Sequence, residues 1–116
     1  MRMWNVPTEY MCRQHLLGEH LELHMFVSTI NMKKSVEGYM TKGLLEPEKI
    51  DKRHDELVQE MEKRNYKHKS PLKKITYDLK GGLVNTCENI EELKRRCPKC
   101  RQRIKESLSH HTQMTK

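Results

Sequence analysis

The chain has 116 residues, enough for one domain, but only 34% of them are hydrophobic, so its apolar core must be thin. Its 23 lysines and arginines outnumber 16 aspartates and glutamates, and the resulting net charge of +7 favours a polyanionic partner such as nucleic acid. No apolar run approaches the roughly 20 residues of a membrane span, and residues 1–7 lack the apolar core of a signal peptide, so we expect a cytoplasmic protein.

The first predicted helix is the longest. It follows an extended lead-in over residues 1–7, takes Thr8 as its N-cap and continues to about Asn31. Its apolar residues recur at the spacing of one helix face, which we expect to be buried. These residues are Leu16, Leu23, Val27 and Ile30.

Two further helical regions follow. After a loop over residues 33–45, Pro47 begins a helix that ends near Arg64, with Ile50, Leu57 and Met61 as its buried stripe. Residues 65–82 are irregular apart from a possible short helical turn over residues 73–77. A third helix starts at Asn85 or Thr86, buries Ile90 and Leu93, and is interrupted or restarted at Pro98. The expected fold is all-α: a compact bundle of about three main helices with an extended lead-in and long loops. Residues 1–109 form one domain, and residues 110–116 form a frayed tail.

The first helix also carries a polar face. His15, Glu19 and Glu22 are spaced i, i+4, i+7 and therefore share a side of the helix that differs from the apolar stripe. Such a face can serve chemistry or can simply be solvated, with local ion pairs. His20 and His24 are also four residues apart, but Glu22 between them is misplaced for the His-Glu-x-x-His motif of metalloproteases.

Two stretches carry a family resemblance. Residues 13–22, beginning Arg-Gln-His-Leu-Leu-Gly-Glu, and residues 50–66, beginning Ile-Asp-Lys-Arg-His-Asp-Glu-Leu, resemble the first and middle helices of the pyrimidine-dimer DNA glycosylases, the phage-type endonuclease V enzymes. The resemblance implies an all-helical enzyme that cuts the glycosidic bond at a pyrimidine dimer and then nicks the backbone at the abasic site. It also implies a phage or viral protein acting in a host cell.

The resemblance assigns roles to particular residues. It implies that the α-amine of Met1 is the nucleophile and that Glu22 assists, with Arg2 and the pair Gln14-His15 at positions that the family uses. An α-amine has a pKa of about 7.7–8.0, against about 10.4 for lysine, so it is more often neutral and nucleophilic at neutral pH. The seven-residue lead-in reaches about 23 Å when extended. That length is enough to fold back over the roughly 21 Å of helix between Thr8 and Glu22.

The chain departs from the family in three places. Leu21 and Met25 stand where the family has arginines that grip DNA, and the basic, aromatic C-terminal segment is absent. Because Arg2 is bulky, we expect Met1 to be retained. The substrate is therefore a pyrimidine dimer or another damaged or modified base in duplex DNA. The alternative is a non-catalytic nucleic-acid-binding protein, a regulator or inhibitor on the same scaffold.

Basic residues spread along the chain, together with the neutral Gln14, are the predicted DNA contacts, and they would position the duplex without reading its sequence. They are Arg2, Arg13, Gln14, His15, Lys33, Lys34, Arg64, Lys67, Lys69, Lys73 and Lys74. We expect a monomer that needs no metal or cofactor for catalysis.

The cysteines leave a further alternative open. A zinc site could use Cys87, Cys97, Cys100 and perhaps Cys12, but a single C-x₂-C pair also fits reduced thiols near a helix end.

Overall fold

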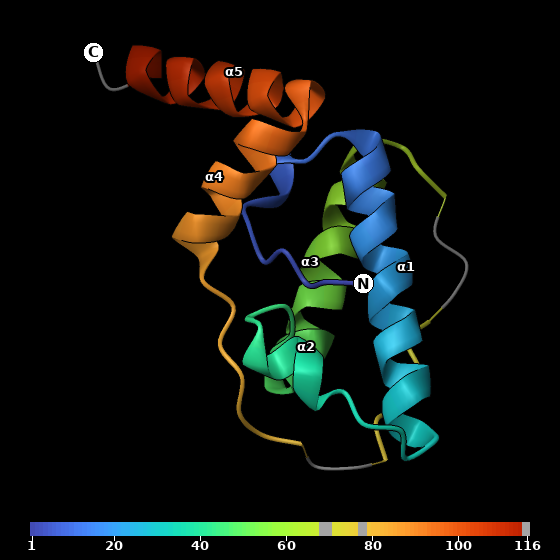
Figure 1. Ribbon diagram of the computed structural model, residues 1–116. Coiled ribbons are helices and arrows are strands. Elements are labelled where there is room, and N and C mark those ends of the chain that lie inside the picture. The colour runs from blue at the N-terminus through green and yellow to red at the C-terminus, as the bar shows by residue number, and fades with distance from the viewer. Residues whose placement is uncertain (68–70, 77–78, 115–116) are drawn as a thin grey trace.

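This computed structural model describes residues 1–67, 71–76 and 79–114, with side chains up to residue 109. In these residues, all the regular structure is helical (Figure 1). The predicted all-α class is confirmed. None of these helices is long and apolar enough to cross a bilayer. The elements are the 3₁₀ turns η1 (Thr8–Tyr10) and η2 (Pro47–Lys49) and the helices α1 (Arg13–Asn31), α2 (Glu37–Thr41), α3 (Ile50–Lys63), α4 (Thr86–Arg96) and α5 (Pro98–Met114).

The two helices α1 and α3 pack side by side and run in opposite directions (Figure 1). Their contact buries the two stripes predicted from the sequence. The stripe residues Leu16, Leu23, Val27, Ile30, Ile50, Leu57 and Met61 are all at most 3% exposed. Burial of such side chains contributes about 1.5–3 kcal/mol each relative to exposure, so this contact is the main stabilising interface of the thin core.

The lead-in, residues 1–7, lies between the α1–α3 pair and α4 (Figure 1). The Asn5 carbonyl accepts a hydrogen bond from Thr86 of α4, and the Val6 carbonyl accepts one from Arg53 of α3. Met3 is fully buried, and its backbone N–H donates to the Leu44 carbonyl over 2.7 Å. Backbone groups of an extended segment must find partners when buried, and here three different parts of the chain supply them.

The predicted start of the first helix is wrong by one turn. Thr8 begins the short turn η1, and α1 starts only at Arg13, with Cys12 as its N-cap. The break occurs at Met11, which is extended (φ −92°, ψ 132°) and fully buried. This break in the helix turns the Met11 side chain into the core and makes Cys12 the N-cap of α1. The Thr8 hydroxyl instead donates to Glu60 of α3.

One other prediction changes in detail, and another, the interruption at Pro98, is confirmed. The expected loop over residues 33–45 contains the short helix α2, which is anchored because Tyr39 packs edge-on against Phe26, with ring centroids 5.1 Å apart. Gly43, at φ +73°, follows it in a conformation that a side chain would strain. The third helical region is two helices, because Cys97 is extended before Pro98 and the chain turns there.

The described residues between α3 and α4, which are 64–67, 71–76 and 79–85, form no helix, as predicted for most of this segment. No helical turn forms over residues 71–76, and Tyr77, the end of the possible turn, lies outside the described residues. Asn31, the last residue of α1, holds this segment in place: its side chain donates to the Lys74 carbonyl and accepts from the Thr76 N–H.

Candidate active site and cysteine–histidine cluster

The start of the chain lies against Glu22 of α1. The backbone N–H of Arg2 donates a 3.0 Å hydrogen bond to Glu22 Oε2. The nitrogen of Met1 precedes that amide nitrogen by one residue, a separation of about 3 Å. Met1 and Glu22 are both half-buried. The lead-in therefore does turn back along α1 and brings the first residue within a few ångströms of the carboxylate.

The side chain of Arg2 is an internal anchor. Its Nη2 donates to Asn89 Oδ1 over 2.8 Å, and its guanidinium carbon lies 3.7 Å from the centroid of the Trp4 ring. Burial, followed by the nearby charge of Arg96, lowers the pKa of Arg2 from its usual value. Trp4 is only 4% exposed and belongs to the core.

Asn89 links α4 to the lead-in. Besides accepting from Arg2, its side-chain nitrogen donates to the Trp4 carbonyl over 2.7 Å. Asn89 is 6% exposed; its bond to the Trp4 carbonyl is buried, and its bond to Arg2 is partly buried. No local sequence signal marks this asparagine, because its partners lie more than eighty residues away in the chain.

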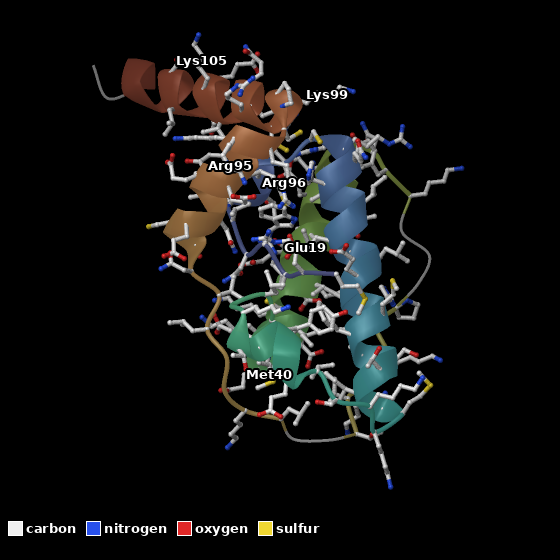
Figure 2. The ribbon with its side chains drawn as sticks, viewed as in Figure 1. Glu19, Met40, Arg95, Arg96, Lys99 and Lys105 are labelled. Carbon is white, nitrogen blue, oxygen red and sulfur yellow. The ribbon has the colours of Figure 1, made fainter. Side chains whose placement is uncertain are left out.

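The second acid of the polar face, Glu19, is not solvated. Its two carboxylate oxygens accept from Nε and Nη2 of Arg53 at 2.7 and 2.8 Å, and the two side chains are 0% and 3% exposed. Figure 2 shows Glu19 between α1 and α3. The same arginine donates to the Val6 carbonyl over 2.8 Å, so the ion pair also fixes the lead-in. Hydrogen bonds from both helices and the lead-in compensate the desolvation of the two charges.

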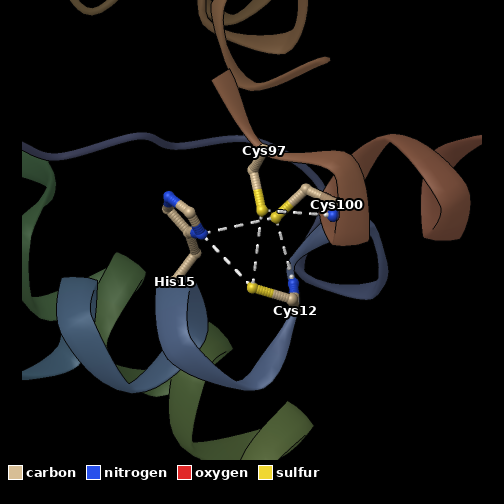
Figure 3. Close-up of side chains that lie close together, drawn as sticks. All are labelled: Cys12, His15, Cys97 and Cys100. Atoms are coloured by element: carbon tan, nitrogen blue, oxygen red, sulfur yellow. Dashed lines mark hydrogen bonds between the residues drawn. The ribbon is translucent and has the colours of Figure 1, made fainter. Parts of the chain in front are cut away.

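The third member of the polar face, His15, lies in a cluster with three cysteines (Figure 3). Its Nδ1 is 3.2 Å from the sulfur of Cys12 and 3.5 Å from the sulfur of Cys100. The sulfurs of Cys12 and Cys97 are 3.9 Å apart. Cys87, which the sequence analysis grouped with these residues, is exposed and outside the cluster. His15, predicted to contact DNA, takes its place.

Burial shapes the acid–base properties of the cluster. It raises the pKa of the Cys100 thiol to about 12. Burial opposes ionisation of Cys97 as well, but the backbone N–H and the thiol of Cys100 donate to its sulfur, and the pKa of Cys97 is lowered. Burial and the charge of Arg96 lower the pKa of His15, which favours its neutral form.

A second histidine cluster lies on another side of α1. His20 and His24 meet His54 of α3, with ring centroids between 4.7 and 5.1 Å apart, and the ring nitrogens that face one another lie within 4.8 Å. The i, i+4 spacing of the first two was visible in the sequence. The third is contributed by the packing of α3 on α1, which no local pattern reveals.

The predicted DNA contacts are dispersed. Arg13 and Gln14 are exposed on the first turn of α1, and the Arg13 guanidinium lies 5.2 Å from the centroid of the Tyr66 ring. Arg64 instead binds Glu60 and the Thr8 carbonyl. Lys69 lies outside the described residues. The remaining lysines, all exposed, are Lys33, Lys34, Lys67, Lys73 and Lys74.

Further basic side chains lie on α4 and α5. Figure 2 shows Arg95 and Arg96 on α4, and Lys99 and Lys105 on α5. Arg95 and Arg96 both donate to Glu92, at 2.6 and 2.9 Å, which partly neutralises them. Among the described residues, the basic side chains are therefore spread over several elements of the molecule.

In a comparison with known families, the sequence model described as pyrimidine dimer DNA glycosylase matches residues 1–74. That region includes the lead-in, α1, α2 and α3, and with them the contact between Arg2 and Glu22. It ends before α4 and α5. Neither the curated proteins nor the solved structures gave a significant match.

Proposed function

Because the chain belongs to the pyrimidine dimer DNA glycosylase family, we propose that it excises a damaged pyrimidine from duplex DNA with the α-amine of Met1 as nucleophile and Glu22 as the assisting carboxylate. The supporting observation is the hydrogen bond from the Arg2 amide to Glu22, which holds the first residue beside this carboxylate. A nucleophile and its proton acceptor need this proximity before any rate enhancement is possible.

The reaction begins at C1′ of the damaged nucleotide. The uncharged amine attacks C1′, the glycosidic bond breaks, and its electron pair leaves with the base. Loss of a proton from the amine and opening of the sugar ring give an iminium ion between the amine and C1′. The Glu22 carboxylate stabilises the positive charge that develops on the sugar, and it accepts and returns protons.

The iminium ion then permits strand cleavage. It withdraws electrons from C2′ and acidifies the C2′ proton. A base takes that proton, a double bond forms between C2′ and C3′, and the C3′–O bond breaks, with the phosphate as leaving group. Water finally hydrolyses the iminium and regenerates the free amine. This β-elimination needs only an amine and a proton acceptor. The α-amine of Met1 and the carboxylate of Glu22 can provide them.

Two exposed side chains near Glu22 are apolar. Leu21 and Met25, on the turns of α1 that flank Glu22, are 60% and 45% exposed. Both side chains offer apolar contact area, whereas cationic side chains at the same positions would bind DNA phosphates. We propose a pyrimidine dimer in duplex DNA as the substrate and a monomer as the active form.

Cleavage of three labelled duplexes tests the proposal: one with a single cyclobutane pyrimidine dimer, one with a single abasic site, and an undamaged control. We expect a direct nick at the dimer and at the abasic site, each with the unsaturated 3′ end of β-elimination, and an intact control. Alkali after the reaction reveals any abasic site that was formed but not nicked.

Comparison of the dimer duplex with the abasic duplex separates the amine mechanism from the preference for a particular lesion. Nicking of the abasic duplex alone would retain the amine mechanism and reject the dimer as substrate. Binding of all three duplexes with no nick and no alkali-labile site would reject the enzyme assignment and leave a DNA-binding protein on this scaffold.

A further inference from the structure

Four side chains that can bind metal converge where the start of α1 meets the start of α5. Cys12 is the N-cap of α1, His15 lies in its first turn, Cys97 directly precedes α5, and Cys100 lies in the first turn of α5 (Figure 3). The three cysteines are buried and His15 is half-buried. We propose that these four side chains bind one zinc ion in a closed structural site.

The distances between the ligand atoms fit a tetrahedron. With zinc–sulfur bonds of about 2.3 Å and zinc–nitrogen bonds of about 2.0–2.1 Å, two sulfurs are separated by about 3.8 Å, and a sulfur and a nitrogen by about 3.6 Å. The sulfurs of Cys12 and Cys97 are 3.9 Å apart, and His15 Nδ1 lies 3.2 and 3.5 Å from the sulfurs of Cys12 and Cys100. All four ligand atoms lie within 4.8 Å of one another.

Hydrogen bonds from the surrounding backbone act against the effect of burial on Cys100 and favour thiolates, the form that binds zinc. The N–H of Cys12 donates to the sulfur of Cys100 over 3.2 Å, and the N–H of Cys100 donates to the sulfur of Cys97 over 3.4 Å. Both donors belong to helix N-termini, whose partial positive charge stabilises nearby anions. These bonds orient the sulfurs toward a common point, as the partners of metal ligands generally do.

A disulfide explains the cluster less well. Bonded sulfurs are about 2.05 Å apart, and all four cysteines of the chain are free. A disulfide would also use only two of the three buried sulfurs and would give no role to the imidazole nitrogen directed at them. Three cysteines and one histidine form a complete ligand set for structural zinc, with no open position for catalysis.

The site would connect the part of the chain that the family model matches to the part that lies beyond the match. Cys12 and His15 lie within residues 1–74, whereas Cys97 and Cys100 lie beyond them. Zinc would thus join α1 to the α4–α5 corner. Because Asn89 of α4 binds both Arg2 and Trp4, the ion would also brace the lead-in that carries Met1.

Metal content and X-ray absorption of the full chain test the proposal without any DNA. We expect about one zinc per chain after exhaustive dialysis, and a first shell of three sulfurs at about 2.3 Å with one nitrogen at about 2.0–2.1 Å. Protein without zinc would overturn the proposal. A shell of nitrogen and oxygen only would also overturn it and would place the ion among His20, His24 and His54.

Variants and thiol labelling locate the site. Cys97→Ser and His15→Ala should lose most of the zinc, whereas Cys87→Ser, which removes an exposed cysteine outside the cluster, should retain it. If the first two variants do not fold, thiol labelling of the wild-type chain still tests the proposal. Cys87 alone should react rapidly with a maleimide. A chelator that removes the zinc should expose the three other thiols. Rapid labelling of all four thiols in the zinc-loaded protein would contradict the assignment. These readouts stand apart from glycosylase activity, so either proposal can fail alone.

Discussion

Asn89 on α4 binds Arg2, 87 residues earlier in the chain, through a 2.8 Å hydrogen bond to the guanidinium, and its amide nitrogen also donates to the Trp4 carbonyl. A helix outside the region matched by the family thus holds the segment that carries the proposed nucleophile. The position of Met1 beside Glu22 therefore depends on packing between the two ends of the chain.

Asn89→Ala tests this dependence. The change removes both bonds and leaves the buried Trp4 carbonyl unsatisfied, so we expect the free energy of unfolding to fall by about 1–3 kcal/mol. Activity on an abasic duplex should fall by a larger factor than the folded fraction, because the lead-in loses its anchor. Urea unfolding and single-turnover cleavage measure the two effects. Glu91→Ala, on the exposed side of α4, should change stability by less than about 0.5 kcal/mol.

Glu22→Gln tests the assisting carboxylate. The amide keeps the size of the side chain and can still accept from the Arg2 N–H, but it can neither stabilise the cationic intermediate nor transfer protons. We expect kcat to fall by about 10²–10⁴-fold with DNA binding unchanged. Glu62→Gln, an exposed carboxylate on α3, is the matched control. Equal loss in both variants would point to net charge as the cause and would remove Glu22 from the mechanism.

The pair of Glu19 and Arg53 is expected to matter for folding. Arg53→Met leaves a carboxylate buried without its partner, which should lower the free energy of unfolding by about 3–5 kcal/mol. Adding Glu19→Leu removes that uncompensated charge and should restore most of the loss. Urea denaturation of the two single variants and the double variant gives the coupling energy. Strictly additive losses would show that the two side chains stabilise the fold independently.

Leu21 and Met25 offer a gain-of-function test. Replacing both with arginine adds two cations on the exposed turns of α1 that flank Glu22, and should tighten binding to duplex DNA. If each arginine contacts a phosphate, the slope of log K against log salt should steepen by about 0.9 per residue. Met32→Arg, at an exposed position at the far end of α1, controls for net charge. A similar gain from Met32→Arg would place the DNA elsewhere.

Local pattern predicted much of the fold. The spacing of Leu16 and Leu23 defined the buried face of α1, and the stripe of Leu57 did the same for α3, because a helix face is a short-range property of the chain. The start of α1 was missed, since the burial of Met11 outweighs the capping preference of Thr8.

The surroundings of the site residues could not be predicted from local sequence patterns. Glu19 lies on a face for which the sequence allowed either chemistry or solvation, and it is buried because it pairs with Arg53 of α3, 34 residues away. His15 was predicted to contact DNA, yet it lies among sulfurs from both ends of the chain. Long-range pairing of this kind depends on how the helices pack, which composition and spacing do not determine.

Trapping with sodium borohydride tests the central claim most directly. The reagent reduces an iminium formed between the protein and an abasic duplex to a stable amine, and peptide mapping then identifies the nitrogen. We predict one protein–DNA adduct, attached to the α-amine of Met1 and lost when that amine is capped. Cleavage of the duplex with no adduct at Met1, or with an adduct on a lysine, would contradict this account.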